Sequence, residues 1–79
     1  MRVIGEIPHP NCKITLFSWN NRYLVKLEQG YLEQTYKIDQ FEVSGDEGLI
    51  QIINEPFIEQ ALKIFDEMNH AWSKAIREG

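Results

Sequence analysis

Apolar and polar side chains alternate along much of the chain from Cys12 to Ile38, with the period of two that is typical of strands with one buried face. Asn20 and Asn21 predict a two-residue hairpin loop within this run, because asparagine tolerates the positive φ that such a loop requires. In the resulting register, one side of the hairpin is apolar and the other is mixed. The apolar side pairs Ser18 with Tyr23, Leu16 with Val25 and Ile14 with Leu27, and the mixed side pairs Trp19 with Arg22, Phe17 with Leu24, Thr15 with Lys26 and Lys13 with Glu28.

A third strand of this sheet follows a second tight turn, which we predict at Gln29 and Gly30. This register places Lys26 against Glu33, and a slip of one residue would instead bury Glu33. Gln34 falls on the apolar side, where a buried amide needs hydrogen-bond partners. It therefore marks a bound ligand, a sheet edge or an error in the register.

An earlier strand is predicted from Arg2 to Ile7, and it is separated from Cys12 by a loop whose two prolines preclude regular pairing. With Ile7 opposite Cys12, Gly5 lies on the core side, where a helix could approach closely. The same register places Glu6 beside Lys13, Val3 beside Leu16 and Gly5 beside Ile14. The prediction is a four-stranded antiparallel meander, in the order 1-2-3-4, over about residues 2–43.

Beyond Val43 the apolar period changes from that of a strand to that of a helix. Ser44 and Glu47 form a capping-box pattern, and the apolar residues after them predict a short helix at about residues 46–53. Pro56 suits the first turn of a second helix, which we predict at about residues 56–77. The expected fold class is therefore α+β, a single domain of residues 1–79 with both helices on one face of the sheet (ββββαα).

The long predicted helix carries two neighbouring apolar stripes. One consists of Ile58, Leu62, Phe65, Asn69, Trp72 and Ile76, and the other of Phe57, Ala61, Ile64, Met68, Ala71 and Ala75. At about 1.5 Å per residue the helix is about 33 Å long, whereas an eight-residue strand spans about 26 Å. The last one or two turns are therefore expected to overhang the sheet and to expose Trp72 and Ile76.

We interpret this excess apolar surface as a protein-association face. The residues predicted to form it are Phe65, Met68, Asn69, Trp72 and Ile76. A chain of 79 residues gains only modest stability from its own core, and closed homodimers are the commonest oligomers. The leading hypothesis is a non-enzymatic protein that works as a homodimer or as a small accessory subunit. Alternatively, the helix crosses the sheet diagonally and both stripes are satisfied within the chain.

The charged side chains are distributed unevenly. Residues 1–43 carry five basic and five acidic side chains, whereas residues 44–79 carry three and seven, which accounts for the net charge of −4. An acidic helical layer argues against generic binding to nucleic acid or to an anionic membrane, because both require a basic face. No apolar segment approaches the ~20 residues that cross a bilayer, and the single cysteine, Cys12, cannot form an internal disulfide. We therefore expect a cytoplasmic location.

The mixed side of the sheet is a second candidate surface. Phe17, Trp19 and Leu24 cluster there with Arg22, in an arrangement able to stack a base, another ring or a partner's aromatic side chain. The alternative function is a ligand-binding or RNA-binding module, although the chain contains no motif of known RNA-binding modules.

Reactive side chains are sparse. His9 and Cys12 have a metal-like spacing, but a zinc site takes three or four protein ligands, and His70 would have to arrive from the distant helix. The simpler interpretation is a small, buried Cys12 and a solvent-exposed His9. A metal-dependent or cysteine-based enzyme is the third hypothesis, and we assign no catalytic, cofactor-binding or metal-binding residue.

Overall fold

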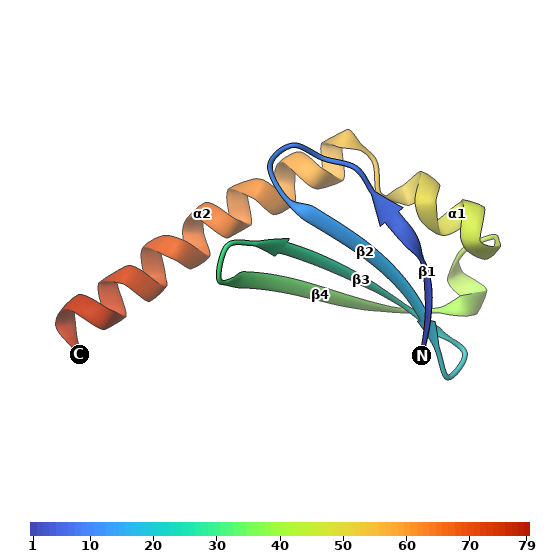
Figure 1. Ribbon diagram of the computed structural model, residues 1–79, viewed down its shortest axis with the longest axis horizontal. Coiled ribbons are helices and arrows are strands. Elements are labelled where there is room, and N and C mark those ends of the chain that lie inside the picture. The colour runs from blue at the N-terminus through green and yellow to red at the C-terminus, as the bar shows by residue number, and fades with distance from the viewer.

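A single antiparallel sheet with the strand order β1-β2-β3-β4 forms one layer of the molecule, and two α-helices form the other (Figure 1). The computed structural model describes residues 1–79. Its elements are β1 (Arg2–Ile7), β2 (Lys13–Trp19), β3 (Arg22–Gln29), β4 (Leu32–Asp39), a 3-10 turn η1 (Gln40–Glu42), α1 (Gly45–Ile52) and α2 (Glu55–Glu78). The predicted ββββαα meander is confirmed.

The β2–β3 hairpin has the predicted register at every pair. Trp19 lies opposite Arg22 and Lys13 lies opposite Glu28, with the five predicted pairs between them. Asn20 and Asn21 adopt φ values of 52° and 63°, as a two-residue loop between twisted strands requires.

The β3–β4 register differs from the prediction by two residues. The loop consists of Gly30, which has a φ of 60°, and Tyr31, so that Glu33 lies opposite Glu28 rather than opposite Lys26. Glycine adopts this conformation without strain. Because the slip is an even number of residues, every side chain keeps its predicted face. The Nζ atom of Lys26 still reaches Glu33 Oε1 diagonally, at 3.5 Å.

The predicted register between β1 and β2 is also wrong by two residues near the loop. Ile7 lies opposite Ile14, because Cys12 belongs to the loop rather than to the ladder. The register then shifts between Val3 and Gly5, as at a β-bulge, and Val3 pairs with Phe17 on the open face instead of with Leu16 in the core. The expected ion pair between Lys13 and Glu6 is present, at 3.7 Å.

The two helices begin and end within one residue of the predicted bounds, but their caps differ. Asn54 caps α2, since its Oδ1 accepts the Phe57 N–H at 3.1 Å. Ser44 precedes α1 without making a side-chain cap, so the predicted capping box is wrong. Its φ and ψ of −90° and 66° are not the extended values that aim a serine hydroxyl at the first turn.

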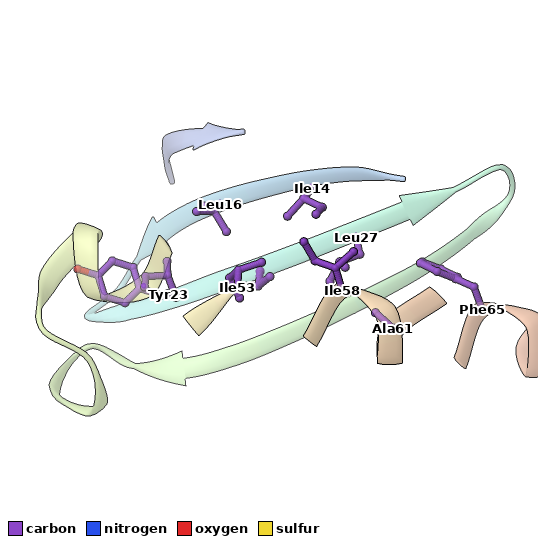
Figure 2. Close-up of a cluster of buried hydrophobic side chains, with 10 residues drawn as sticks. Ile14, Leu16, Tyr23, Leu27, Ile53, Ile58, Ala61 and Phe65 are labelled. Atoms are coloured by element: carbon purple, nitrogen blue, oxygen red, sulfur yellow. The ribbon is translucent and has the colours of Figure 1, made fainter. Parts of the chain in front are cut away.

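The core lies between the sheet and the N-terminal half of α2, together with α1. Figure 2 shows labelled side chains from β2, β3, the loop after α1 and α2 pointing toward one another. The buried apolar set is Ile14, Leu16, Tyr23, Val25, Leu27, Leu49, Ile53, Ile58, Ala61 and Phe65. Mutual burial of these side chains from the sheet and the helices is the main term that stabilises the fold.

Gln34, the amide on the core side of β4, joins the sheet to α2. Its Nε2 donates to the Ala61 carbonyl of the helix at 2.8 Å, and its Oε1 accepts a hydrogen bond from the Tyr36 hydroxyl at 2.6 Å. The Tyr36 ring in turn packs edge-on against Phe57, with the ring centroids 5.6 Å apart. The buried amide is thus satisfied within the chain and fixes where α2 crosses β4.

At the opposite end of the molecule, Asp46 joins α1 to the sheet. Its Oδ1 accepts a hydrogen bond from the Tyr23 hydroxyl at 3.0 Å, and its Oδ2 lies 3.6 Å from the Arg2 guanidinium. The hydrogen bond to this carboxylate raises the pKa of the Tyr23 hydroxyl above its ordinary value, and burial adds to the effect.

Neither α1 nor α2 combines the length and the apolar character of a membrane-spanning helix.

Candidate functional site

The C-terminal end of α2 extends beyond the sheet, as its length predicts (Figure 1). The helix runs antiparallel to β4, and the Tyr31 hydroxyl, from the β3–β4 loop, donates a hydrogen bond to Asn69 Oδ1. The loop is the last part of the sheet that α2 meets. The turns that follow Asn69 therefore project into solvent, which contributes to the longest dimension of the molecule, 45 Å.

The projecting turns, together with Met68 just before them, carry an apolar surface, which we call the overhang face. It consists of Met68, Ala71, Trp72, Ala75 and Ile76. Trp72 is 53% exposed and Ile76 is 61% exposed, whereas Met68 is partly buried against the core. In the N-terminal half of the helix, the equivalent positions Ile58, Ala61 and Phe65 are buried against the sheet. The same stripe therefore changes from core to surface where the sheet ends.

A groove of about 640 Å³ lies between the overhang face and the β3–β4 loop. Its lining is entirely apolar or aromatic and consists of Tyr31, Leu32, Met68, Ala71 and Trp72. The sequence prediction missed Tyr31 and Leu32, because the two-residue error in the register placed Tyr31 on a strand rather than in the loop. A concave apolar surface of this kind, left open in a single chain, is typical of an interaction site.

The five residues predicted for association occupy three different environments. Phe65 is 0% exposed and belongs to the core, so its side chain is not available to a partner. Asn69 is bonded to Tyr31 and helps to shape the groove. Met68 lines the groove and is partly buried, whereas Trp72 and Ile76 are open to solvent over half of their surface or more.

A second apolar region lies beside the far end of β4. Phe41, in η1, is 85% exposed, and Ile52, at the end of α1, is also exposed. A smaller groove of about 290 Å³ runs between β4 and the helices there, and its lining includes Tyr36, Ile38 and Ile52. No sequence signal marks this region, because periodicity places Ile52 on an apolar helix face without showing that the face extends past the sheet.

The open face of the sheet brings together the residues predicted for ligand binding. Trp19 is 50% exposed and stands beside the exposed Arg22. Leu24 is buried by its neighbours and Phe17 is partly buried, so only part of the predicted cluster is accessible. Met1 helps to line a shallow hollow of about 210 Å³ with Phe17 and Leu24. This surface has no deep pocket.

His9 and Cys12 lie near the N-terminus of α2. The prediction of a solvent-exposed His9 is wrong, because its side chain is only 8% exposed. Its Nδ1 accepts the Asn11 N–H at 3.1 Å, and its Nε2 lies 3.7 Å from Glu55 Oε2.

Burial raises the pKa of the Cys12 thiol, and the Glu55 carboxylate raises it further, so the thiol stays protonated and is a poor nucleophile at neutral pH. No group of three or more His, Cys, Asp or Glu side chains is placed to hold a metal ion.

Comparisons of the chain with family models, with curated proteins and with solved structures found no match. The function of the chain is therefore inferred from its own surfaces.

Proposed function

We propose that this chain is a small, non-enzymatic association domain that forms a homodimer through the overhang face of α2. The observation that carries the proposal is the half-exposed Trp72 over an open groove whose lining contains no charged residue. Tryptophan has a large apolar surface and is enriched among the residues that dominate binding energy at protein interfaces. A second subunit would remove this surface from water.

The size of the protein supports the same proposal. Only 13 of the 79 residues are buried in the single chain, so the apolar surface withdrawn from water by folding is small. Each large apolar side chain that is fully buried contributes about 1.5–3 kcal/mol. Burying the remaining surface of Trp72 and Ile76 therefore represents a substantial gain for so small a core. The free thiol of Cys12 fits the reducing cytoplasm, where we place the protein.

Light scattering over a concentration series tests the proposal, and the chain offers a matched pair of variants. Trp72→Glu places a charge on the overhang face and is expected to give a monomer. Trp19→Glu makes the same change at a tryptophan of similar exposure on the open face of the sheet, and this variant is expected to keep the dimer. Circular dichroism confirms that both variants are folded. A wild-type protein that remains monomeric at several hundred micromolar, or an unchanged mass of Trp72→Glu, would contradict the proposal.

The open face of the sheet supports a second candidate function, a ligand-binding module. The supporting observation is Trp19 beside Arg22, an exposed ring next to a cation, which is an arrangement that stacks planar ligands. Titration with a nucleotide and with a short single-stranded RNA, followed by tryptophan fluorescence, tests this function. Trp19→Ala should abolish a response that Trp72→Ala retains, and no response from the wild-type protein to either probe would exclude these ligands.

A further inference from the structure

The free edge of β4 is the second feature that a partner could use. β4 is the last strand of the sheet, and its backbone pairs only with β3. It runs for eight residues without a proline or a bulge. The other edge strand, β1, is interrupted by a register shift and is followed by Pro8. Edges that must stay unpaired usually carry such interruptions, so β4 is the edge suited to accept another strand.

The sequence of β4 is complementary to itself in the antiparallel register centred on Thr35, which pairs most of the strand. Consider two copies of β4 side by side, with Thr35 opposite Thr35 and a two-fold axis between them, perpendicular to the sheet. Glu33 of each copy would then lie opposite Lys37 of the other, on the open face. Lys37 has no ion-pair partner in its own chain. Moving the axis by one residue, to Tyr36, would instead oppose Glu33 and Asp39. Opposite charges directly across a sheet are favourable and like charges are not.

The same two-fold axis would bring the overhang face to the second apolar region. Ala61 of α2 is bonded to Gln34 of β4, which lies next to the axis, and Trp72 lies eleven residues further along the helix, or about 17 Å. Phe41 lies in η1, just beyond the end of β4 at Asp39, and Asp39 is four residues, or about 13 Å, from Thr35 along the strand. Because α2 runs antiparallel to β4, the overhang of one copy points toward the Phe41 end of the other. The two apolar regions therefore lie at similar distances from the axis and on the same side of it.

We infer that the partner of the overhang face is a second copy of this chain, joined antiparallel along β4 about Thr35, so that Phe41 of one copy packs into the groove beside Trp72 of the other. This inference rests on the proposed function and specifies its geometry. The dimer contains a continuous eight-stranded sheet with all helices on one face, and the symmetry places one Phe41 in each of its two grooves. One interface of this kind accounts for the free edge, the unpaired Lys37 and the most exposed aromatic side chain of the molecule.

Charge reversal followed by mixing tests the inference. Glu33→Lys and Lys37→Glu each oppose like charges at both symmetric positions, and each is expected to weaken dimerisation about tenfold or more. An equimolar mixture of the two variants opposes unlike charges again, and native mass spectrometry should show the heterodimer as the main species. Glu28→Lys reverses a charge on the same face but on the inner strand β3, and this control is expected to remain dimeric.

The outcomes separate the β4 interface from the overhang face. Glu33→Lys removes the ion pair with Lys26, so Lys37→Glu, which removes none, provides the independent result if the first variant fails to fold. If Lys37→Glu dimerises as tightly as the wild type while Trp72→Glu is monomeric, the β4 register is wrong and the proposed function stands. If neither variant dissociates the dimer, both are wrong, and a strictly monomeric wild type also overturns both.

Discussion

Gln34 shows how a single polar residue can position a helix. Its amide lies among apolar side chains, is almost fully buried and bonds both Ala61 and Tyr36. Gln34→Glu replaces the donor with a carboxylate that faces the Ala61 carbonyl, and we expect it to lower the free energy of unfolding by about 2 kcal/mol or more at pH 7. Urea denaturation measures the change. Gln60→Glu, the same substitution on the exposed side of α2, should have little effect, and equal losses at the two sites would contradict the role assigned to Gln34.

The sequence identifies Gln34 as unusual, but it does not reveal the role of this residue. Alternation places its side chain on the buried side of β4, so a hydrogen-bond partner is required. The partner is a helix carbonyl 27 residues further along the chain, and no local pattern specifies which one. Likewise, its place in a loop predicted an exposed His9, whereas its side chain is only 8% exposed and its Nε2 lies 3.7 Å from Glu55 Oε2. Residue environments that depend on distant segments are the part of a site that periodicity does not predict.

The hydrogen bond between Tyr23 and Asp46 predicts a dependence of stability on alkaline pH. Because the folded protein raises the pKa of the Tyr23 hydroxyl, the stabilising contribution is fully present below the ordinary tyrosine value of about 10 and is lost as the pH rises through the folded-state value. Urea denaturation between pH 8 and pH 11 should therefore show a steeper loss of stability for the wild type than for Tyr23→Phe. Tyr31→Phe makes the same change at an exposed tyrosine, and this control should retain the wild-type slope. Parallel curves for the wild type and Tyr23→Phe would contradict the prediction.

At the scale of the elements, the two helix caps provide a matched pair. Asn54 accepts a hydrogen bond from the first turn of α2, whereas Ser44 makes no such bond at α1. Asn54→Ala should therefore destabilise the protein by about 1 kcal/mol, and Ser44→Ala by only about a few tenths of a kcal/mol. Thermal and urea denaturation measure both. A cost at Ser44 equal to that at Asn54 would mean that the predicted capping box forms in solution.

The strand registers show which element-scale features are predictable. The Asn20–Asn21 loop is specified by its own residues, and the β2–β3 pairs follow from it in full. At β3–β4 the glycine is compatible with either of two loop positions, and a shift of two residues preserves both faces. Charge pairing did not resolve the choice, because Lys26 reaches Glu33 diagonally in the observed register. Alternation therefore determines the face of each residue, while the pairs across the strands require the loop conformation.

At the scale of the whole molecule, a comparison of lengths predicted the main feature of the candidate site. A helix of 24 residues is longer than a strand of eight, so its end must project from a sheet of this size. The residues of the site were predicted less well, because the position at which α2 leaves the sheet depends on the Gln34 and Tyr31 contacts. These contacts place Phe65 over the sheet and Trp72 beyond it. Within an apolar helix stripe, no feature of the sequence marks the residue at which the helix leaves the sheet.

Stability and association should be linked in a protein with so small a core. If folded chains dimerise and unfolded chains do not, mass action raises the thermal midpoint with concentration. For a domain of this size we expect the Tm to rise by about 3–5 °C for each tenfold increase in concentration above the dimer Kd. Trp72→Glu should lose this dependence because it removes the contact and leaves the buried core unchanged, whereas Trp19→Glu should keep it. Scanning calorimetry or circular dichroism over a hundredfold range of concentration measures the effect. A wild-type midpoint that is constant over this range would show that the overhang face adds nothing to the stability of the fold through self-association.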